Sequence, residues 1–291
     1  ATTFGSLIQV PEGLAAKLPA LKQLSETTSQ DLFVSEALKR LGPLVQQAEL
    51  LATQYDAVVA NPPYMGGKAM NGSVKKFTKD YFPDAKSDLF ACFIERGFTL
   101  TGDAGHNAMV TMQSWMFLST YERMRQRMLR EKTIRTMVHM SNGVMGIAFG
   151  TAATVIKNVA LPGYVAEYSH TSVDDLDFQR VPTVFPVRNN RLKSLAQDEF
   201  KKIPGSPIAY WASPALTDMF ENEAYESQAS VRQGMATTDN ERFLRQWHEL
   251  SIGAIGFNFS SPSEGNEDGY DWFPYNKGGE YRKWYGNLSY V

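Results

Sequence analysis

The apolar run Tyr55–Ala60, of sequence YDAVVA, constrains the fold most, because Asn61 and two consecutive prolines follow it directly. Short runs of this kind, rich in valine and flanked by turn signals, are typical of buried strands in a parallel sheet. Pro62 and Pro63 have no backbone N–H and hold φ at about −65°, so a strand cannot continue through them. The sequence therefore predicts a central strand that ends abruptly in a rigid corner.

The segments around this strand alternate between helical and strand patterns. The predicted helices span residues 31–52, 87–100 and 118–132, and the other predicted strands span residues 106–112, 134–140 and 152–159. The first helix contains Gly42 and Pro43, which we expect to kink or divide it. The last two strands have no helix between them. We therefore predict an α/β sheet that is closed by a hairpin.

The composition excludes several classes of protein. With 43% hydrophobic and 21% charged residues, the chain is globular and not disordered. The single cysteine, Cys92, rules out an internal disulfide and a cysteine-based zinc cluster, and it favours a reducing, cytoplasmic compartment. The four histidines show no metal-ligand spacing, so we expect no metal. No apolar run approaches the roughly 18 residues that a membrane span needs, so we expect no membrane partner.

Overall charge does not mark the chain as a nucleic-acid-binding protein, because its net charge is −2. Residues 121–135 nevertheless carry five arginines and a lysine against two glutamates. We interpret this segment as the solvated face of a surface helix. After about Pro162 prolines, aromatic residues and short irregular stretches take over, and we expect a domain boundary within residues 166–171.

The corner after the first predicted strand suits a planar amino group. The carbonyl of Pro62 is held in one direction, and Asn61 adds a side-chain carbonyl that accepts a second hydrogen bond. Tyr64 supplies a flat face on which a ring stacks. Two acceptors on one conjugated amine favour a pyramidal nitrogen with a localised lone pair. Such a nitrogen attacks an electrophilic methyl group directly, without a cysteine nucleophile.

These residues carry a family resemblance. Asn61-Pro62-Pro63-Tyr64 at the end of a buried strand resembles the catalytic motif of S-adenosylmethionine-dependent methyltransferases that act on planar amino groups. In the DNA adenine-N6 branch the target base is flipped out of the duplex. The resemblance implies that Asn61 and the Pro62 carbonyl accept from adenine N6, and that Tyr64 stacks on the flipped ring. The alternative is an ordinary proline turn after a strand.

A second motif resembles a later part of the same class. In GVMGIAFGTAATVIK, residues 143–157, Phe149 matches a phenylalanine that covers the other face of the flipped base. A core phenylalanine in a hairpin is the equally weighted alternative.

The carboxyl-terminal part makes the resemblance more specific. Residues 231–249 and 271–287, the latter reading DWFPYNKGGEYRKWYGN, resemble segments that open the target-recognition region of combined restriction–modification methyltransferases. They resemble most closely the PglX-type methyltransferases of BREX phage-defence systems. Aromatic residues interleaved with cations suit phosphate contacts and base stacking. The candidate DNA-binding residues are Arg232, Arg242, Arg245, Lys277, Arg282, Lys283 and Trp284. The alternative is an aromatic-rich core with a cationic rim.

The resemblance implies how the chain is divided. Residues 1–168 would be the carboxyl-terminal half of a Rossmann-like catalytic domain, and residues 169–291 the start of a mixed α/β target-recognition domain. The implied cofactor is S-adenosylmethionine. Its glycine-rich turn and the acidic residue that holds the ribose are not recognised in this sequence. We therefore expect a fragment that is inactive alone, whose partners are double-stranded DNA, the remainder of the parent polypeptide and other defence-system proteins.

The predicted function is site-specific methylation of adenine N6 in DNA, by base flipping, in phage defence or restriction–modification. One alternative is methylation of a protein glutamine or of RNA, against which the aromatic and basic carboxyl-terminal segment argues. Another is a non-catalytic DNA-binding or assembly module, which the unrecognised cofactor motifs favour.

Overall fold

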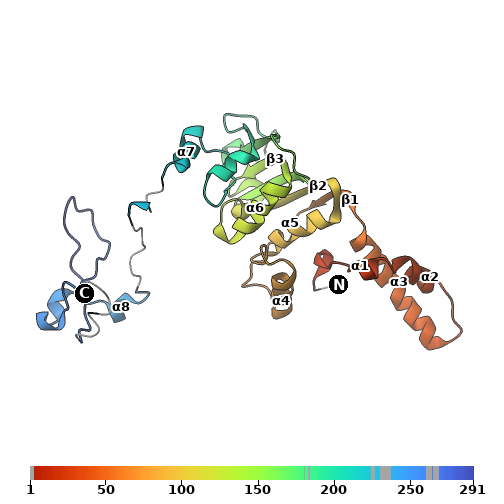
Figure 1. Cartoon of the computed structure of the whole chain (residues 1–291), viewed down its shortest axis with the longest axis horizontal. Helices are drawn as coiled ribbons and strands as arrows, with labels where there is room; N and C mark the ends of the chain where they lie inside the picture. The colour runs from red at the N-terminus through yellow and green to blue at the C-terminus, as the bar shows by residue number, and fades with distance from the viewer. Residues whose placement is uncertain are drawn as a thin grey trace. The chain divides into compact units, whose positions relative to one another are not determined.

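The computed structural model describes residues 3–179, 181–182, 184–223, 227–229, 237–259, 264 and 269–291. The chain divides into two compact units, Ala1–Ala224 and Tyr225–Val291. All the strands that are described belong to the first unit (Figure 1).

A six-stranded mixed sheet forms the centre of the first unit. Its strands are β1 (Tyr55–Ala60), β2 (Thr101–Met112), β3 (Thr133–Met140), β4 (Thr151–Lys157), β5 (Val165–Thr171) and β6 (Lys193–Ala196). They lie in the order β1-β2-β4-β3-β5-β6. β1, β2, β3 and β5 run in one direction, and β4 and β6 run in the other. One end of the sheet, here called the carboxyl end, therefore gathers the carboxyl ends of four strands and the amino ends of β4 and β6.

The four predicted strands are all found, but the predicted central and buried place of the first one is wrong. β1 is the outermost strand of the described sheet, and four of its six residues are exposed, because only β2 pairs with it among the described strands. β1 has the predicted bounds, β3 and β4 differ from theirs by one or two residues, and β2 begins earlier, at Thr101. β3 and β4 form the expected hairpin, but the hairpin does not close the sheet. β4 lies between β2 and β3, antiparallel to both, and the sheet continues from β3 through β5 to β6. The expected domain boundary falls inside β5, and the sheet continues through it to β6. The division of functions between residues 1–168 and 169–291 stays a prediction.

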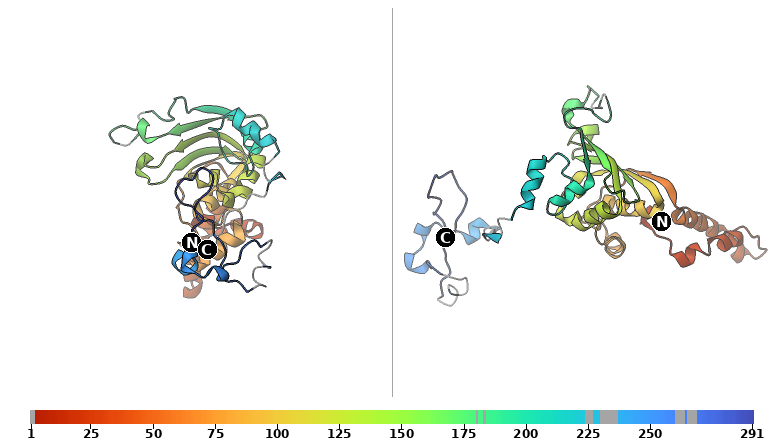
Figure 2. Two further views of the ribbon diagram at one scale, coloured as in Figure 1. Left: turned by 90° about the vertical axis from the view of Figure 1, so that its left-hand side faces the viewer. Right: turned by 45° about the horizontal axis from the view of Figure 1, so that its top comes forward.

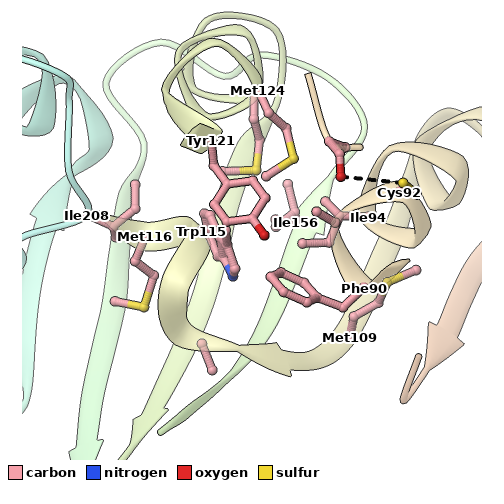
Figure 3. Packing of buried hydrophobic residues seen from close by; sticks show 14 of the residues in the cluster. Phe90, Cys92, Ile94, Met109, Trp115, Met116, Tyr121, Met124, Ile156 and Ile208 are labelled. Atoms are coloured by element: carbon pink, nitrogen blue, oxygen red, sulfur yellow. Dashed lines mark hydrogen bonds between the residues drawn. The ribbon is translucent and has the colours of Figure 1, made fainter. Parts of the chain in front are cut away.

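Helices α5 (Leu89–Leu100) and α6 (Glu122–Glu131) pack on the same face of the sheet (Figure 2). Figure 3 shows Phe90 from α5, Tyr121 and Met124 from the start of α6, and Ile156 from β4 converging in this core. The predicted helix 87–100 is therefore confirmed, with Asp88 as its cap. Burial of these large side chains against one face is the main force that holds both helices on the sheet.

Three further helices precede β1. α1 (Glu12–Ala15) and α2 (Leu18–Ser25) contact α3 (Leu32–Ala52), whose cap Asp31 accepts from the N–H of Phe33 at 2.8 Å. α3 continues through Pro43 without a break, so of the two expected outcomes, a kink or a division, the division is wrong. Pro43 removes one backbone hydrogen bond, but the turns on both sides keep theirs.

Three helices remain in the described part of the chain. They are α4 (Gly72–Tyr81), α7 (Pro214–Asp218) and α8 (Asn240–Phe243).

Arg125 in the basic segment does not lie on a solvated face, as the sequence suggested for the segment as a whole. Its side chain is fully buried and donates to the carbonyls of Ser206 at 2.9 Å, Trp115 at 2.8 Å and Leu118 at 3.1 Å. It also donates to the carbonyl of Gly205 at 2.5 Å. The guanidinium thus joins the turn after β2 to Gly205, which lies 80 residues beyond Arg125 along the chain.

The second unit contains little regular structure among its described residues. α8 and short 3₁₀ turns are accompanied by isolated bridges, including Gln246 with Tyr290 and Ile255 with Trp272. The terminal residue Val291 donates to the carbonyl of Arg245 at 2.9 Å and accepts from its N–H at 3.0 Å. In the part of the chain that the structure describes, no helix is both long and apolar enough to cross a membrane.

Candidate active site

The corner after β1 places Asn61 at the carboxyl end of the sheet. Asn61 and Pro63 are exposed, and Pro62 between them is buried. The Tyr64 hydroxyl lies 3.1 Å from Oδ1 of Asn61 and 3.1 Å from the carbonyl of Val110 in β2. A phenol has one proton, so it donates to one of these oxygens at a time. No hydrogen bond reaches the Pro62 carbonyl from any residue that the structure describes. The exposed Asn61 therefore places one oxygen acceptor beside the Tyr64 hydroxyl, and the Pro62 carbonyl that follows it is a second acceptor without a bond from the described residues.

Asp88 fastens the segment after this corner to the start of α5. Its Oδ1 accepts from the N–H of Met65 at 2.9 Å and from the N–H of Phe90 at 3.3 Å. The N–H of Leu89 in turn donates to the carbonyl of Met65 at 3.2 Å. Burial raises the pKa of Asp88, and the N–H groups of Met65, Phe90 and Leu89 oppose that shift. The contact with Met65 has no local signature in the sequence, because Met65 is 23 residues away from Asp88 along the chain.

The Tyr64 ring lies between two phenylalanines. Its centroid is 6.2 Å from that of Phe90 and 5.5 Å from that of Phe149, and both pairs meet edge to face. Burial raises the pKa of the Tyr64 phenol, so the hydroxyl stays protonated at physiological pH. The structure thus brings Asn61, Tyr64 and Phe149 together, as the two sequence motifs predicted separately. The roles given to these residues stay predictions.

The loop between β3 and β4, residues 141–150, brings Phe149 back to the corner after β1. Gly143 and Gly146 have φ of 87° and 71°, which a residue with a Cβ rarely adopts. The N–H of Gly143 donates to the carbonyl of Ile147 at 2.7 Å and closes the turn. The glycines of the later motif are therefore required by backbone geometry.

A second feature of the same end of the sheet is a pocket of about 340 Å³ lined in part by residues of β3, β5 and β6. His139 in β3 and His170 in β5 are register partners, and their ring centroids are 5.2 Å apart. Nδ1 of His139 lies 3.0 Å from the Tyr210 hydroxyl, and Nε2 contacts Oε1 of Gln113. The sequence did not indicate this cluster, because β5 was not predicted and the histidines lack metal spacing. Within the described residues, no three His, Cys, Asp or Glu side chains group to hold a metal ion.

The pH dependence of stability is expected to report on His139. Burial lowers the pKa of His139 to about 4, below its value of about 6.5 in an unfolded chain. The neutral ring is therefore favoured by folding, and its contribution is lost as pH falls from 6.5 to 4. We expect wild type to lose roughly 3 kcal/mol more unfolding free energy than His139→Asn between pH 7 and pH 4. Urea titrations at several pH values measure this difference, and parallel curves for both proteins would contradict it.

Three of the carboxyl-terminal candidates form an exposed group. Arg282, Lys283 and Trp284 are consecutive, and the indole of Trp284 is 79% exposed. The Lys283 ammonium lies 5.5 Å from the centroid of that indole. An exposed ring with cations beside it matches the expected surface for phosphates and bases.

The other candidates have contacts within the second unit. Arg245 donates to the carbonyls of Glu241 at 2.8 Å and Leu244 at 2.7 Å, so part of its guanidinium is already used. Arg242 lies 5.0 Å from the ring of Phe243, and Lys277 lies 4.7 Å from that of Tyr290. Arg232 lies outside the described residues. Direct contact of these residues with DNA stays a prediction.

Residues 17–145 of the chain match the family model of the Eco57I restriction-modification methylase. This range includes Asn61, Tyr64 and Asp88 and ends just before Phe149. The type IIG restriction endonuclease BpuSI, a solved structure, is 10% identical and aligns over 74% of this chain and 27% of its own. The TM-score of that alignment is 0.42, too low to establish a shared fold.

Two curated relatives match most or all of the chain. The adenine-specific methyltransferase BrxX of Escherichia coli O9:H4 (strain HS) is 45% identical over 298 residues, which is 100% of this chain and 24% of the relative. The adenine-specific methyltransferase PglX of Lacticaseibacillus casei (strain Zhang) is 39% identical over 260 residues, which is 85% of this chain and 21% of the relative. The chain spans about a quarter of the length of these relatives. The resemblance seen in the sequence is therefore confirmed: the chain is similar to part of the adenine-specific methyltransferases BrxX and PglX.

Proposed function

We propose that this chain is part of a DNA adenine-N6 methyltransferase of BREX or restriction–modification type. It contains the segment Asn61–Tyr64 of the catalytic domain and the beginning of the target-recognition domain. The observation that carries the proposal is the placement of Asn61 at the carboxyl end of β1, with the rings of Tyr64 and Phe149 beside it. Ligands of α/β sheets bind outside the carboxyl ends of strands. The similarity to adenine-specific methyltransferases supports adenine as the target.

The corner would act by holding the target amine. Oδ1 of Asn61 and the carbonyl of Pro62 accept the two N–H bonds of adenine N6. This arrangement disfavours the flat, conjugated form of the amine and directs its lone pair away from both oxygens, toward the methyl donor. Once the base has entered, both acceptors hold the amine, so little further reorganisation is needed during the methyl transfer.

The two rings must separate before a base enters between them. Tyr64 and Phe149 now meet edge to face at 5.5 Å, whereas a base stacked on both faces needs rings about 7 Å apart, two contact distances of about 3.5 Å. Entry also requires the Tyr64 hydroxyl to release Oδ1 of Asn61. We propose that it then keeps its bond to the carbonyl of Val110 while its ring turns toward the base.

The described residues do not by themselves fit S-adenosylmethionine. At the carboxyl end of the sheet, none of the described strands leads through Gly-x-Gly into a helix, which is the arrangement that brings backbone close to this type of cofactor. The corner supplies acceptors for an amine and no cradle for the donor. We propose that the cofactor binds this site together with further polypeptide, and that the chain alone is inactive.

The family resemblance, and not the fold, supports the expected division of the chain, because the sheet continues through residue 168. We propose that residues 1–168 belong to the carboxyl-terminal half of a Rossmann-like domain and that residues 169–291 begin the target-recognition domain. The exposed group Arg282, Lys283 and Trp284 supports contact with double-stranded DNA in the second part. Other defence-system proteins remain proposed partners on the basis of the BREX-type relatives.

Transfer of a labelled methyl group from S-adenosylmethionine to duplex DNA tests the function. The chain is assayed alone and within a full-length protein of the BrxX type, and the DNA is digested to nucleosides. We expect labelled N6-methyladenine from the full-length protein only. Label in RNA or in a protein glutamine would identify another acceptor. No label from a folded, cofactor-binding protein would favour a DNA-binding or assembly module.

A further inference from the structure

The pocket at the carboxyl end of the sheet, called the His139–Trp211 pocket below, has a mixed lining. Its lining residues include His139, His170, Arg191, Lys193, Tyr210 and Trp211. β3 and β5 supply the histidines, the start of β6 supplies Lys193, and the chain after β6 returns with Tyr210 and Trp211. All of these elements belong to the first unit. A volume of about 340 Å³ is in the range of small-molecule sites.

The aromatic wall of this pocket is fixed from behind. Tyr210 is buried, stacks on Tyr168 at 5.4 Å and lies within hydrogen-bond distance of Nδ1 of His139. Trp211 lies 5.9 Å from the His139 ring with an angle of 33° between the planes, yet 53% of Trp211 is exposed. The indole of Trp211 is therefore positioned by its neighbours but remains open to solvent, so a base can stack on it.

The polar side of the pocket is also held in place. The Arg191 guanidinium contacts both carboxylate oxygens of Asp175 at 2.6 Å and donates to the Ser172 hydroxyl at 2.7 Å. Its charge is thus balanced inside the wall. Lys193 is exposed and has no ion pair with any residue that the structure describes. The net charge that remains at the mouth is positive, which favours an anionic ligand.

A nucleotide matches this combination better than simpler ligands do. A phosphate alone would leave the open indole of Trp211 unused, and a purely apolar ligand would desolvate Lys193 without compensation. A base stacked on the indole with its phosphate on the ammonium satisfies both groups. The side-chain amide of Asn190, also in the lining, has a donor and acceptors for a base edge.

The position of the pocket relates it to the corner at Asn61. Gln113 contacts His139 and fills the space that a Cβ on Gly150 would need. Gly150 directly follows Phe149, whose ring contacts Tyr64. A continuous set of contacts at the carboxyl end of the sheet therefore links the pocket to the proposed site of base entry.

We propose that the His139–Trp211 pocket binds one nucleotide, with the base stacked on Trp211 and the phosphate on Lys193. The inference rests on the proposed function in one respect: DNA that delivers an adenine to Asn61 passes the same end of the sheet, so the nucleotide belongs to the DNA strand. A free nucleotide has the same chemistry and is the other source to be tested.

Binding by fluorescence anisotropy tests this directly on the 291-residue chain. The probes are a labelled single-stranded oligonucleotide, a labelled duplex and a labelled deoxynucleoside monophosphate. We expect Trp211→Ala and Lys193→Gln each to weaken oligonucleotide binding roughly 5- to 100-fold. Phe33→Ala and Lys39→Gln remove an exposed ring and an exposed lysine of α3, outside the pocket, and serve as matched controls without effect.

Each outcome bears on the proposal. Direct binding of a labelled deoxynucleoside monophosphate that Trp211→Ala and Lys193→Gln weaken, while both variants leave oligonucleotide binding unchanged, identifies a free nucleotide as the ligand. Binding of oligonucleotide and monophosphate that is unchanged by both variants overturns the proposal. If Trp211→Ala does not fold, the milder Trp211→Phe variant and the exposed Lys193→Gln variant test the proposal in its place. Methylation is not read in this assay, so a failure of the proposed activity is recognised separately.

Discussion

Asn61→Ala in a full-length protein of the BrxX type is expected to lower N6-methyladenine formation by about 100-fold or more. The change removes one of the two oxygen acceptors that we propose for the amine, and the Pro62 carbonyl alone does not hold both N–H bonds. Because Asn61 is exposed, the free energy of unfolding should stay within about 0.5 kcal/mol of wild type. Methyl transfer to duplex DNA and urea unfolding, measured on the same preparations, check both expectations.

Two further variants make this result interpretable. Asn61→Asp keeps side-chain oxygens at the same position and should retain more activity than the alanine variant. Asn222→Ala removes an exposed asparagine elsewhere in the first unit and should leave methylation unchanged. DNA affinity should be the same for all three variants. Loss of DNA binding in Asn61→Ala, with methylation reduced only in proportion, would argue for a DNA-binding module.

Arg125→Met is expected to lower the unfolding free energy of the first unit by roughly 3 to 5 kcal/mol. Methionine has a similar length but no donors, so it leaves the carbonyls of Trp115 and Ser206, whose bonds to Arg125 are buried, and the partly buried carbonyl of Gly205 without the partner that Arg125 provides. The segment around Ser206 leads into Tyr210 and Trp211. Urea unfolding measures the loss, and weaker oligonucleotide binding should accompany it if the His139–Trp211 pocket is formed by this segment.

The control for this prediction lies on the same helix. Arg130 is exposed on α6, so Arg130→Met should change the unfolding free energy by no more than about 0.5 kcal/mol. Arg125→Lys keeps the charge but replaces a planar fork by a single ammonium, and it should recover only part of the loss. A cost below about 1 kcal/mol for Arg125→Met would show that the buried hydrogen bonds contribute little.

The sequence was sufficient where local chemistry decides the structure. The apolar run before Asn61 has the bounds of β1, because two prolines end a strand wherever they occur. Asp88 caps α5, because its side chain accepts from an N–H two residues later. The turn that carries Phe149 needs glycines at Gly143 and Gly146, which the motif contains.

The rest depends on contacts between distant parts of the chain. Arg125 looks like any other arginine of a basic helix until Gly205 and Ser206 are placed beside it. His139 and His170 become neighbours only because β3 pairs with β5, and no local sequence pattern predicted this pairing. At Pro43 a local signal was misleading: the helix is not divided there, because the neighbouring turns of α3 outweigh one missing hydrogen bond.

β1 is the outermost strand of the described sheet, so the strand that ends at Asn61 should open locally more often than its neighbours. The strand pairs only with β2, its register shifts between Tyr55 and Ala57, and Val59 is 79% exposed. Local opening costs least where backbone hydrogen bonds are solvated and few apolar contacts are lost. The amides of β1 should therefore exchange with deuterium sooner than those of β2. A further strand paired with the open edge of β1 would slow this local opening and would hold Asn61, which follows β1, more firmly in place.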